Sequence, residues 1–377
     1  MPTMNPEGRI TRRGFLGLSS AALASAGLMG NASAAKSAPS LDSTVDSAKL
    51  EAVPPASKIA LEEHFVLPES ADITGYPLGG RLLMPEFWHK IHDMGNGRIA
   101  EMDRGGVELC ILSLTSPGIQ AIPNISQAVA VSRRANDYLA ENIAKFPKRF
   151  KGFAALPLQD PQAAAQELTR CVKELGFCGA LANGFSQIGE ADSAVFYDLP
   201  QYRPFWATVQ QLDVPFYLHP RAALATRQQA YDGHPWLVGP AWGFAVETSI
   251  HALRLMGSGL FDEYPKLKVI LGHLGEGLPF NIWRVDHCIS TVTSGTKAKL
   301  SIGQYLRENF YITTSGNFRT QALSDVILEV GADRILYSVD YPYEDVVEAK
   351  EWFDQAAISD SDRMKIARTN AQKLFHL

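Results

Sequence analysis

Short apolar runs alternate with amphipathic stretches along the chain from residue 58 onward. Eight runs have the length and the β-branched or aromatic content of buried strands, at residues 58–65, 107–115, 150–156, 177–183, 214–219, 267–273, 310–314 and 334–340. Several intervening stretches repeat apolar residues at helical spacing, as Leu168, Cys171, Val172 and Leu175 do at i, i+3, i+4 and i+7. The pattern predicts strands that alternate with helices.

The number of these repeats indicates the fold class. Eight strands alternating with helices favour a closed parallel (β/α)8 barrel, the TIM barrel of α/β proteins, over an open doubly wound sheet, which is the alternative. The connections at 66–106, 184–213 and 220–266 are longer than a minimal strand–helix link requires. Since long loops at the carboxyl ends of barrel strands build active sites, we expect a covered pocket there.

The first 34 residues have the organisation of a twin-arginine signal peptide. Arg12 and Arg13 precede an apolar run of small residues at 17–29, and the tripeptide Ala-Ser-Ala at 32–34 fits a cleavage site. Residues 35–57 are rich in Ala, Ser and Pro and predict a linker, which leaves 58–377 as a single barrel domain. We therefore expect a periplasmic or secreted protein; a disordered tail that contains two arginines by chance is the alternative.

Composition and charge exclude several classes of function. The chain is 46% hydrophobic and 20% charged, has a formal net charge of −5, and contains no Lys/Arg-rich run, so nothing indicates a nucleic-acid partner. No run approaches the roughly 18 apolar residues of a membrane span. Neither a dinucleotide glycine fingerprint nor a P-loop is present, and we expect no organic cofactor.

Ionisable residues lie at the ends of four predicted strands. Glu62 and His64 are two residues apart in the first run and would share a face of an extended strand, while His219, His273 and Asp340 end the fifth, sixth and eighth runs. In a barrel these ends meet at one mouth. Imidazoles and carboxylates together form a ligand set for one divalent ion, Zn²⁺ or Mn²⁺. A structural role is the alternative for any single histidine.

Longer motifs around these residues resemble the amidohydrolase-related decarboxylases of hydroxylated benzoic acids, the γ-resorcylate and 2,3-dihydroxybenzoate decarboxylases. The resemblance extends from residue 58 to the carboxyl terminus. It is carried by the stretches at 60–65, 154–161, 183–187, 197–206, 216–221, 231–236, 272–279 and 313–319. These motifs are far more specific than the barrel itself.

The resemblance implies a role for each strand-end residue. It implies that one metal ion is bound by Glu62, His64, His219 and Asp340, and that Glu276 orients His273 beside the ion. Glu62 stands where many hydrolytic relatives have the first histidine of an H-x-H pair, which indicates a mononuclear site. The resemblance also implies assembly as a tetramer or dimer.

Four further residues are candidates for substrate binding. Arg284 matches an arginine near the pocket of the family, and Tyr76 and Tyr343 fall where residues face the substrate ring. Both tyrosines replace Phe of the relative compared, a departure that bears on which ring substituents are accepted. His234, on the long loop at 220–266, is a candidate from its position alone.

The predicted function is non-oxidative decarboxylation of a dihydroxybenzoate-type acid, and the reverse carboxylation is left open. Loss of CO₂ would leave an aryl carbanion unless the ring carbon is first protonated, and an acid beside the metal, Asp340, is the proton donor that the family implies. Two alternatives remain open. One is a hydrolase of a lactone, ester or amide on the same barrel, and the other is a non-catalytic periplasmic binding protein.

Overall fold

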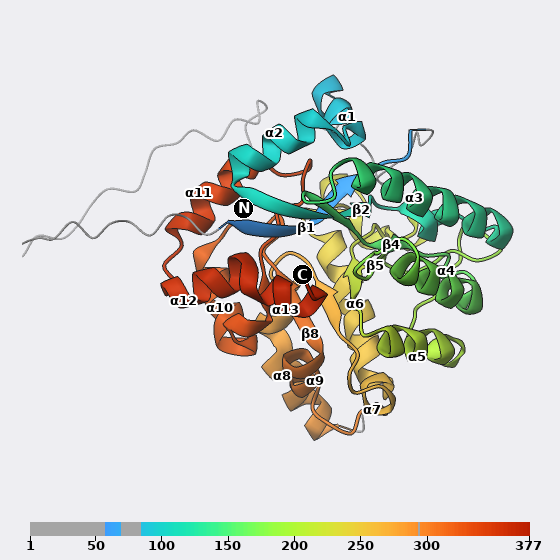
Figure 1. Cartoon of the computed structure of the whole chain (residues 1–377). Helices are drawn as coiled ribbons and strands as arrows, with labels where there is room; N and C mark the ends of the chain where they lie inside the picture. Colours follow the sequence, from blue (N-terminus) through green and yellow to red (C-terminus); the bar gives the residue numbers. More distant parts are fainter. Residues whose placement is uncertain (1–56, 69–83, 293–294) are drawn as a thin grey trace, which may run out of the picture. The chain divides into compact units, whose positions relative to one another are not determined.

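The computed structural model describes residues 57–68, 84–292 and 295–377 (Figure 1). The predicted signal peptide at 1–34, all of the predicted linker except Ser57, and Tyr76 lie outside these residues. The expected domain boundaries therefore stay predictions. Within the described residues, no helix is both long and apolar enough for a membrane crossing.

Strands form at all eight predicted places, and the third run is divided at Phe153 into two short strands. The strands are β1 (Lys58–Phe65), β2 (Val107–Leu114), β3 (Phe150–Gly152), β4 (Ala154–Ala155), β5 (Ala180–Asn183), β6 (Phe216–His219), β7 (Val269–Leu271), β8 (Phe310–Thr313) and β9 (Ile335–Leu336). Every neighbouring pair is parallel.

The strands close into a barrel at two seams. The hydrogen-bonded order is β1-β2-β3 in one sheet and β4 through β9 in the other. At the first seam, the Phe153 amide donates to the Leu112 carbonyl at 2.9 Å, and the Ala154 amide donates across to Gly179 at 2.9 Å. At the second, Leu61 of β1 forms a parallel bridge with Ser338, just beyond β9. The predicted (β/α)8 barrel is therefore confirmed.

Helices follow the strands and cover the outside of the barrel (Figure 1). The α-helices are α1 (Pro85–His92), α2 (Asn96–Gly105), α3 (Ile125–Lys145), α4 (Pro161–Lys173), α5 (Arg203–Leu212), α6 (Gly243–Gly257), α7 (Leu260–Glu263), α8 (Leu278–Thr291), α9 (Ile302–Asn309), α10 (Thr320–Val330), α11 (Val346–Gln355), α12 (Asp360–Met364) and α13 (Asn370–Phe375). Helix α4 buries Leu168 and Cys171, as its spacing predicted.

Among the described residues the core has three apolar clusters, of which two larger ones divide the barrel and a small one contains Val66, Phe87 and Ile91. Of the two that divide the barrel, the larger lies between strands and helices, and it includes Ala60 and Leu112. The smaller of the two takes the alternate strand positions, among them Ile59 and Leu61, and includes residues of α13. This alternation follows from the period of two in a strand. It leaves the carboxyl ends of the strands to the polar residues of the site.

Candidate metal centre

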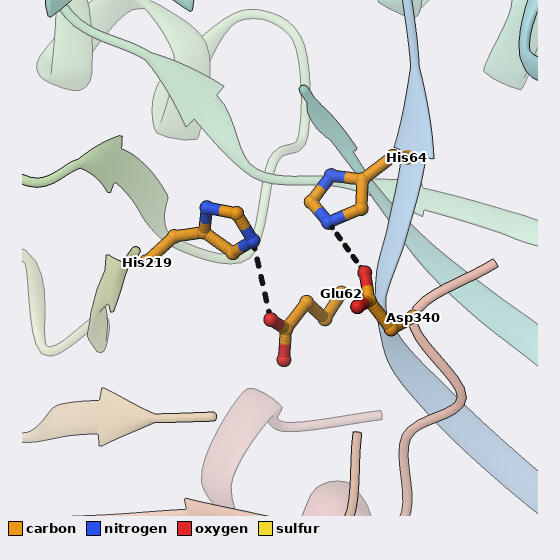
Figure 2. Close-up of side chains that lie close together, drawn as sticks. All are labelled: Glu62, His64, His219 and Asp340. Atoms are coloured by element: carbon orange, nitrogen blue, oxygen red, sulfur yellow. Dashed lines mark ion pairs between the residues drawn. The ribbon is translucent and has the colours of Figure 1, made fainter. Parts of the chain in front are cut away.

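Four of the predicted strand-end residues converge at the mouth of the barrel. Figure 2 shows Glu62 and His64 from β1, His219 from the end of β6, and Asp340 from the segment after β9, all directed toward one another. One potential ligand atom from each lies within 4.8 Å of the other three. Segments nearly 280 residues apart in sequence thus form one compact donor set.

The contacts within this set are close and almost free of solvent. His64 Nε2 lies 3.1 Å from Asp340 Oδ1, and His219 Nε2 lies 3.2 Å from Glu62 Oε1 (Figure 2). The Glu62 and His64 side chains are fully buried, and that of Asp340 is 14% exposed. Burial would raise the pKa of Glu62, but His273, His219 and His64 outweigh burial and hold it below its usual value.

The donor atoms fit a divalent cation. Glu62 Oε1, His64 Nε2 and Asp340 Oδ1 are buried and have no hydrogen-bond partner among the described residues. Among the described residues, these atoms form ion pairs with one another and with the neighbouring histidines, and buried polar atoms that lack hydrogen bonds are costly unless another group binds them. The set of two imidazoles and two carboxylates, mostly buried around one point, is suited to a single divalent first-row metal.

The backbone at this site is unusual. Five of the seven described non-glycine residues with positive φ lie here: Glu62, His273, Leu274, Glu276 and Asp340. Strained conformations of this kind cluster at functional sites, where the surrounding fold holds them in place. Local backbone strain is therefore concentrated at this site.

Glu62 and His64 lie at the same site because β1 is irregular, and not because its side chains alternate regularly. The pairing of β1 with β2 shifts register between Ala60 and Glu63, and Glu62 has a left-handed backbone with φ of 61°. The side chains therefore converge through an irregularity in the strand. The expectation of a regular extended strand was wrong, although the two residues do lie together.

His273 and Glu276 stand beside the four donors. His273 Nε2 lies 3.7 Å from Glu62 Oε1 and 3.6 Å from Asp340 Oδ2, while His273 Nδ1 is 2.7 Å from Glu276 Oε1. Burial would lower the pKa of His273, but Glu276 and Glu62 outweigh it and raise the pKa well above its usual value. The pair therefore favours a positively charged imidazole at the edge of the site.

The predicted substrate-binding residues differ in where they lie. The Tyr343 ring packs 5.6 Å from that of His64, and its hydroxyl is 2.7 Å from Thr115 Oγ1. Arg284 is exposed on α8, and His234 is exposed on its loop. Among the described residues, no hydrogen bond or ion pair joins Arg284 or His234 to the four potential metal ligands. Tyr76 lies outside the described residues.

A cavity of about 480 Å³ adjoins the site on the side of α6. His273, Glu276 and Asn317 are among its lining residues, together with apolar residues such as Phe244 and Leu253. A volume of this size falls within the range of small-molecule sites.

Sequence reasoning missed the hydroxyl groups that hold the donors in place. Ser113 Oγ lies 3.2 Å from His64 Nδ1, and Tyr217 and Thr313 both hydrogen-bond to Glu62 Oε2. Tyr217 is two residues before His219, so the same period of two could have indicated that it faces the barrel interior. Ser113 and Thr313 are polar residues in otherwise apolar strands, which is a weaker signal.

The comparisons with known proteins agree with this architecture. Residues 87–377 match the family described as Amidohydrolase. The chain is 56% identical over 323 residues to gamma-resorcylate decarboxylase of Rhizobium sp. strain MTP-10005, a match that covers 85% of this chain and 98% of that protein.

The chain is also similar to solved structures of dihydroxybenzoate decarboxylases. A structure of 2,6-dihydroxybenzoate decarboxylase complexed with 2,6-dihydroxybenzoate matches with a TM-score of 0.80 and 54% identity, over 85% of this chain and 99% of that one. The dihydroxybenzoic acid decarboxylase of Polaromonas sp. JS666, solved with manganese and the inhibitor 2-nitroresorcinol, matches with a TM-score of 0.80 and 54% identity, over 85% and 97%. The chain belongs to the amidohydrolase family, in the group that contains the dihydroxybenzoate decarboxylases.

Proposed function

We propose that this protein is a metal-dependent, non-oxidative decarboxylase of hydroxylated benzoic acids, with 2,6-dihydroxybenzoate as its expected substrate. The observation that carries the proposal is the buried donor set of two imidazoles and two carboxylates, with the His273 imidazole beside it. The extensive likeness to 2,6-dihydroxybenzoate decarboxylases supports the choice of substrate.

The metal is proposed to be Mn²⁺, with Zn²⁺ as the alternative. Glu62, His64, His219 and Asp340 would hold it, since their ligand atoms lie together. The manganese bound in the Polaromonas relative supports Mn²⁺, and the mixed nitrogen and oxygen donors also suit Zn²⁺. When bound, the ion supplies positive charge that orients the substrate carboxylate and its ortho hydroxyl. No organic cofactor is proposed.

Asp340 is the proposed proton donor. In its protonated form, its carboxyl group would give a proton to the ring carbon that bears the carboxylate. The bond between that carbon and the carboxylate then breaks, CO₂ leaves, and the electron pair restores the aromatic ring. Asp340 regains its proton from solvent. A positioned acid of this kind contributes roughly 10²- to 10⁴-fold to a rate.

His273 and Glu276 would orient the substrate. A protonated His273 attracts an anionic substrate, and its Nε2 lies 3.6 Å from Asp340 Oδ2, so it also stabilises the carboxylate that proton transfer leaves behind. Glu276 fixes the imidazole through Nδ1. Tyr343 and Tyr76 are proposed to face the substrate ring, and substrate contacts by Arg284 and His234 remain predictions.

The decisive experiment is an assay of the metal-loaded protein. Decarboxylation of 2,6-dihydroxybenzoate predicts equal yields of resorcinol and CO₂ that depend on added metal. Hydrolysis of a lactone, ester or amide on the same barrel is the second candidate, and it would require no CO₂ release. Absence of CO₂ from a panel of hydroxybenzoates would contradict the proposed function.

We also propose that the protein is a homo-oligomer, either a tetramer or a dimer. Large apolar side chains are exposed on and around α6 and α8, among them Trp242 at 59%, Phe280 at 81% and Trp283 at 71% exposure. Aromatic side chains of this kind are enriched at protein–protein interfaces. Light scattering that gives the monomer mass across the working concentration range would contradict the proposal.

Export through the twin-arginine route is proposed from the amino-terminal residues alone. Replacing both Arg12 and Arg13 by Lys should prevent accumulation of the protein outside the cytoplasm. Fractionation of cells that express each form tests this, and export of the double variant at normal levels would contradict the proposal.

A further inference from the structure

The two carboxylate oxygens of Glu62 have different surroundings. Oε1 lies 3.2 Å from His219 Nε2 and 3.7 Å from His273 Nε2. Oε2 accepts hydrogen bonds from the Tyr217 hydroxyl and, at 3.3 Å, from Thr313 Oγ1. Glu62, Tyr217 and Thr313 are all fully buried. The hydrogen bonds to Oε2 therefore leave Oε1 as the Glu62 oxygen that faces the other potential metal ligands.

The hydroxyl groups around Oε2 form a connected hydrogen-bond network, in which the Tyr217 and Thr313 hydroxyls also lie 3.0 Å apart. The His273 amide donates to Ser315 Oγ at 3.1 Å, and Ser315 Oγ lies 2.9 Å from Thr313 Oγ1. Each hydroxyl has a single proton to donate. If Ser315 donates to Thr313, then Thr313 can donate to Glu62 Oε2, and Tyr217 donates to the same oxygen. In this arrangement two hydroxyl groups donate hydrogen bonds to Glu62 Oε2 from different sides, which suits an ionised carboxylate.

Gly272 closes the third side of the carboxylate. A Cβ atom at this position would lie 2.9 Å from Glu62 Oε2, 3.0 Å from Oε1 and 3.1 Å from Ser315 Oγ. Contacts below about 3 Å are essentially never observed for a real Cβ atom. The carboxylate therefore packs directly against the main chain, and only a glycine leaves it room.

We propose that Tyr217 is a positioning residue that, together with Thr313, restricts Glu62 to binding the divalent cation through Oε1 alone. The inference deepens the proposed function and rests on it only for the presence of the cation. Without these donors, Oε2 would be a buried charged oxygen lacking hydrogen bonds, a costly state. The carboxylate would then no longer be held with Oε1 toward the other three ligand side chains, which weakens binding of the cation.

The test is Tyr217→Phe in the full chain, measured by Mn²⁺ binding. The variant keeps the ring that packs 5.9 Å from Phe153 and 6.4 Å from His219, and removes only the hydroxyl. Chelator competition on metal-free protein should give a Kd for Mn²⁺ that is about 10- to 100-fold weaker than that of the wild type. The electron paramagnetic resonance spectrum of the bound Mn²⁺ should also change.

Tyr202→Phe is the matched control. Tyr202 is equally buried, and its hydroxyl donates to the Leu158 carbonyl oxygen at 2.7 Å. This variant loses one buried hydrogen bond without touching Glu62, and should bind Mn²⁺ as the wild type does. If Tyr217→Phe fails to fold, Thr313→Val removes the other donor and should weaken Mn²⁺ binding in the same way.

The outcomes separate this inference from the proposed function. An unchanged Kd and spectrum in Tyr217→Phe or Thr313→Val, or an equal loss of affinity in Tyr202→Phe, would overturn the positioning role. A wild-type protein that binds one Mn²⁺ per chain but releases no CO₂ would overturn the decarboxylase function, and the binding test would still decide the role of Tyr217.

Discussion

Replacing Glu276 by Gln removes the charge that favours a protonated His273, while the side chain keeps its size. Glu276 Oε1 lies 2.7 Å from His273 Nδ1, and the Glu276 side chain is only 2% exposed, so water screens this contact little. A hydrogen bond to a charged group contributes about 1.5–3 kcal/mol. Because Gln cannot supply this stabilisation of the imidazolium, the substitution should lower the pKa of His273.

This change should be visible in the pH dependence of catalysis. If the protonated imidazole attracts the anionic substrate, activity falls as the pH rises through the pKa of His273. In Glu276→Gln, the alkaline limb of kcat/KM for CO₂ release should move to lower pH. The exposed Glu263, which pairs with Arg203, offers a control because Glu263→Gln should leave the profile unchanged. An unshifted alkaline limb in Glu276→Gln would refute the reasoning.

Three further predictions concern the donors and the fold. Asp340→Asn should lower kcat for CO₂ release at least 10²-fold without altering the circular dichroism spectrum, and retained turnover would exclude Asp340 as the proton donor. His219→Ala should lose stoichiometric metal by elemental analysis, and unchanged metal content would count against its role as a ligand. Asp354→Ala leaves the buried Lys58 ammonium, 2.8 Å away, without its partner. It should lower the free energy of unfolding in urea by about 3 kcal/mol, a loss that the more exposed Lys365–Asp333 pair should not show in Asp333→Ala.

The barrel could be predicted because the burial of strands and helices requires apolar residues at regular positions in the sequence. Strands buried on both faces require runs of apolar residues, and helices require the 3.6-residue period, so both are visible without coordinates. The break at Phe153 was not visible, since a strand that passes from one sheet to the next keeps the same apolar composition.

The candidate site was predictable in membership but not in geometry. Parallel strands bring their carboxyl ends together, which was sufficient to group Glu62, His64, His219 and Asp340. The left-handed backbone of Glu62 and Asp340 was not predictable, because it is imposed by tertiary contacts and not by local preference. The hydroxyl of Tyr217 likewise acquires its role only through a contact 155 residues away in sequence.

The central claim is that one divalent cation, held by four side chains, enables this protein to release CO₂ from a hydroxybenzoate. Metal-free protein and protein reloaded with Mn²⁺ should be incubated with 2,6-dihydroxybenzoate labelled with ¹³C in the carboxyl group. The account predicts labelled CO₂ and an equal amount of resorcinol only after reloading, with one Mn²⁺ bound per chain. Equal CO₂ release without metal, or none from a fully loaded protein, would contradict it.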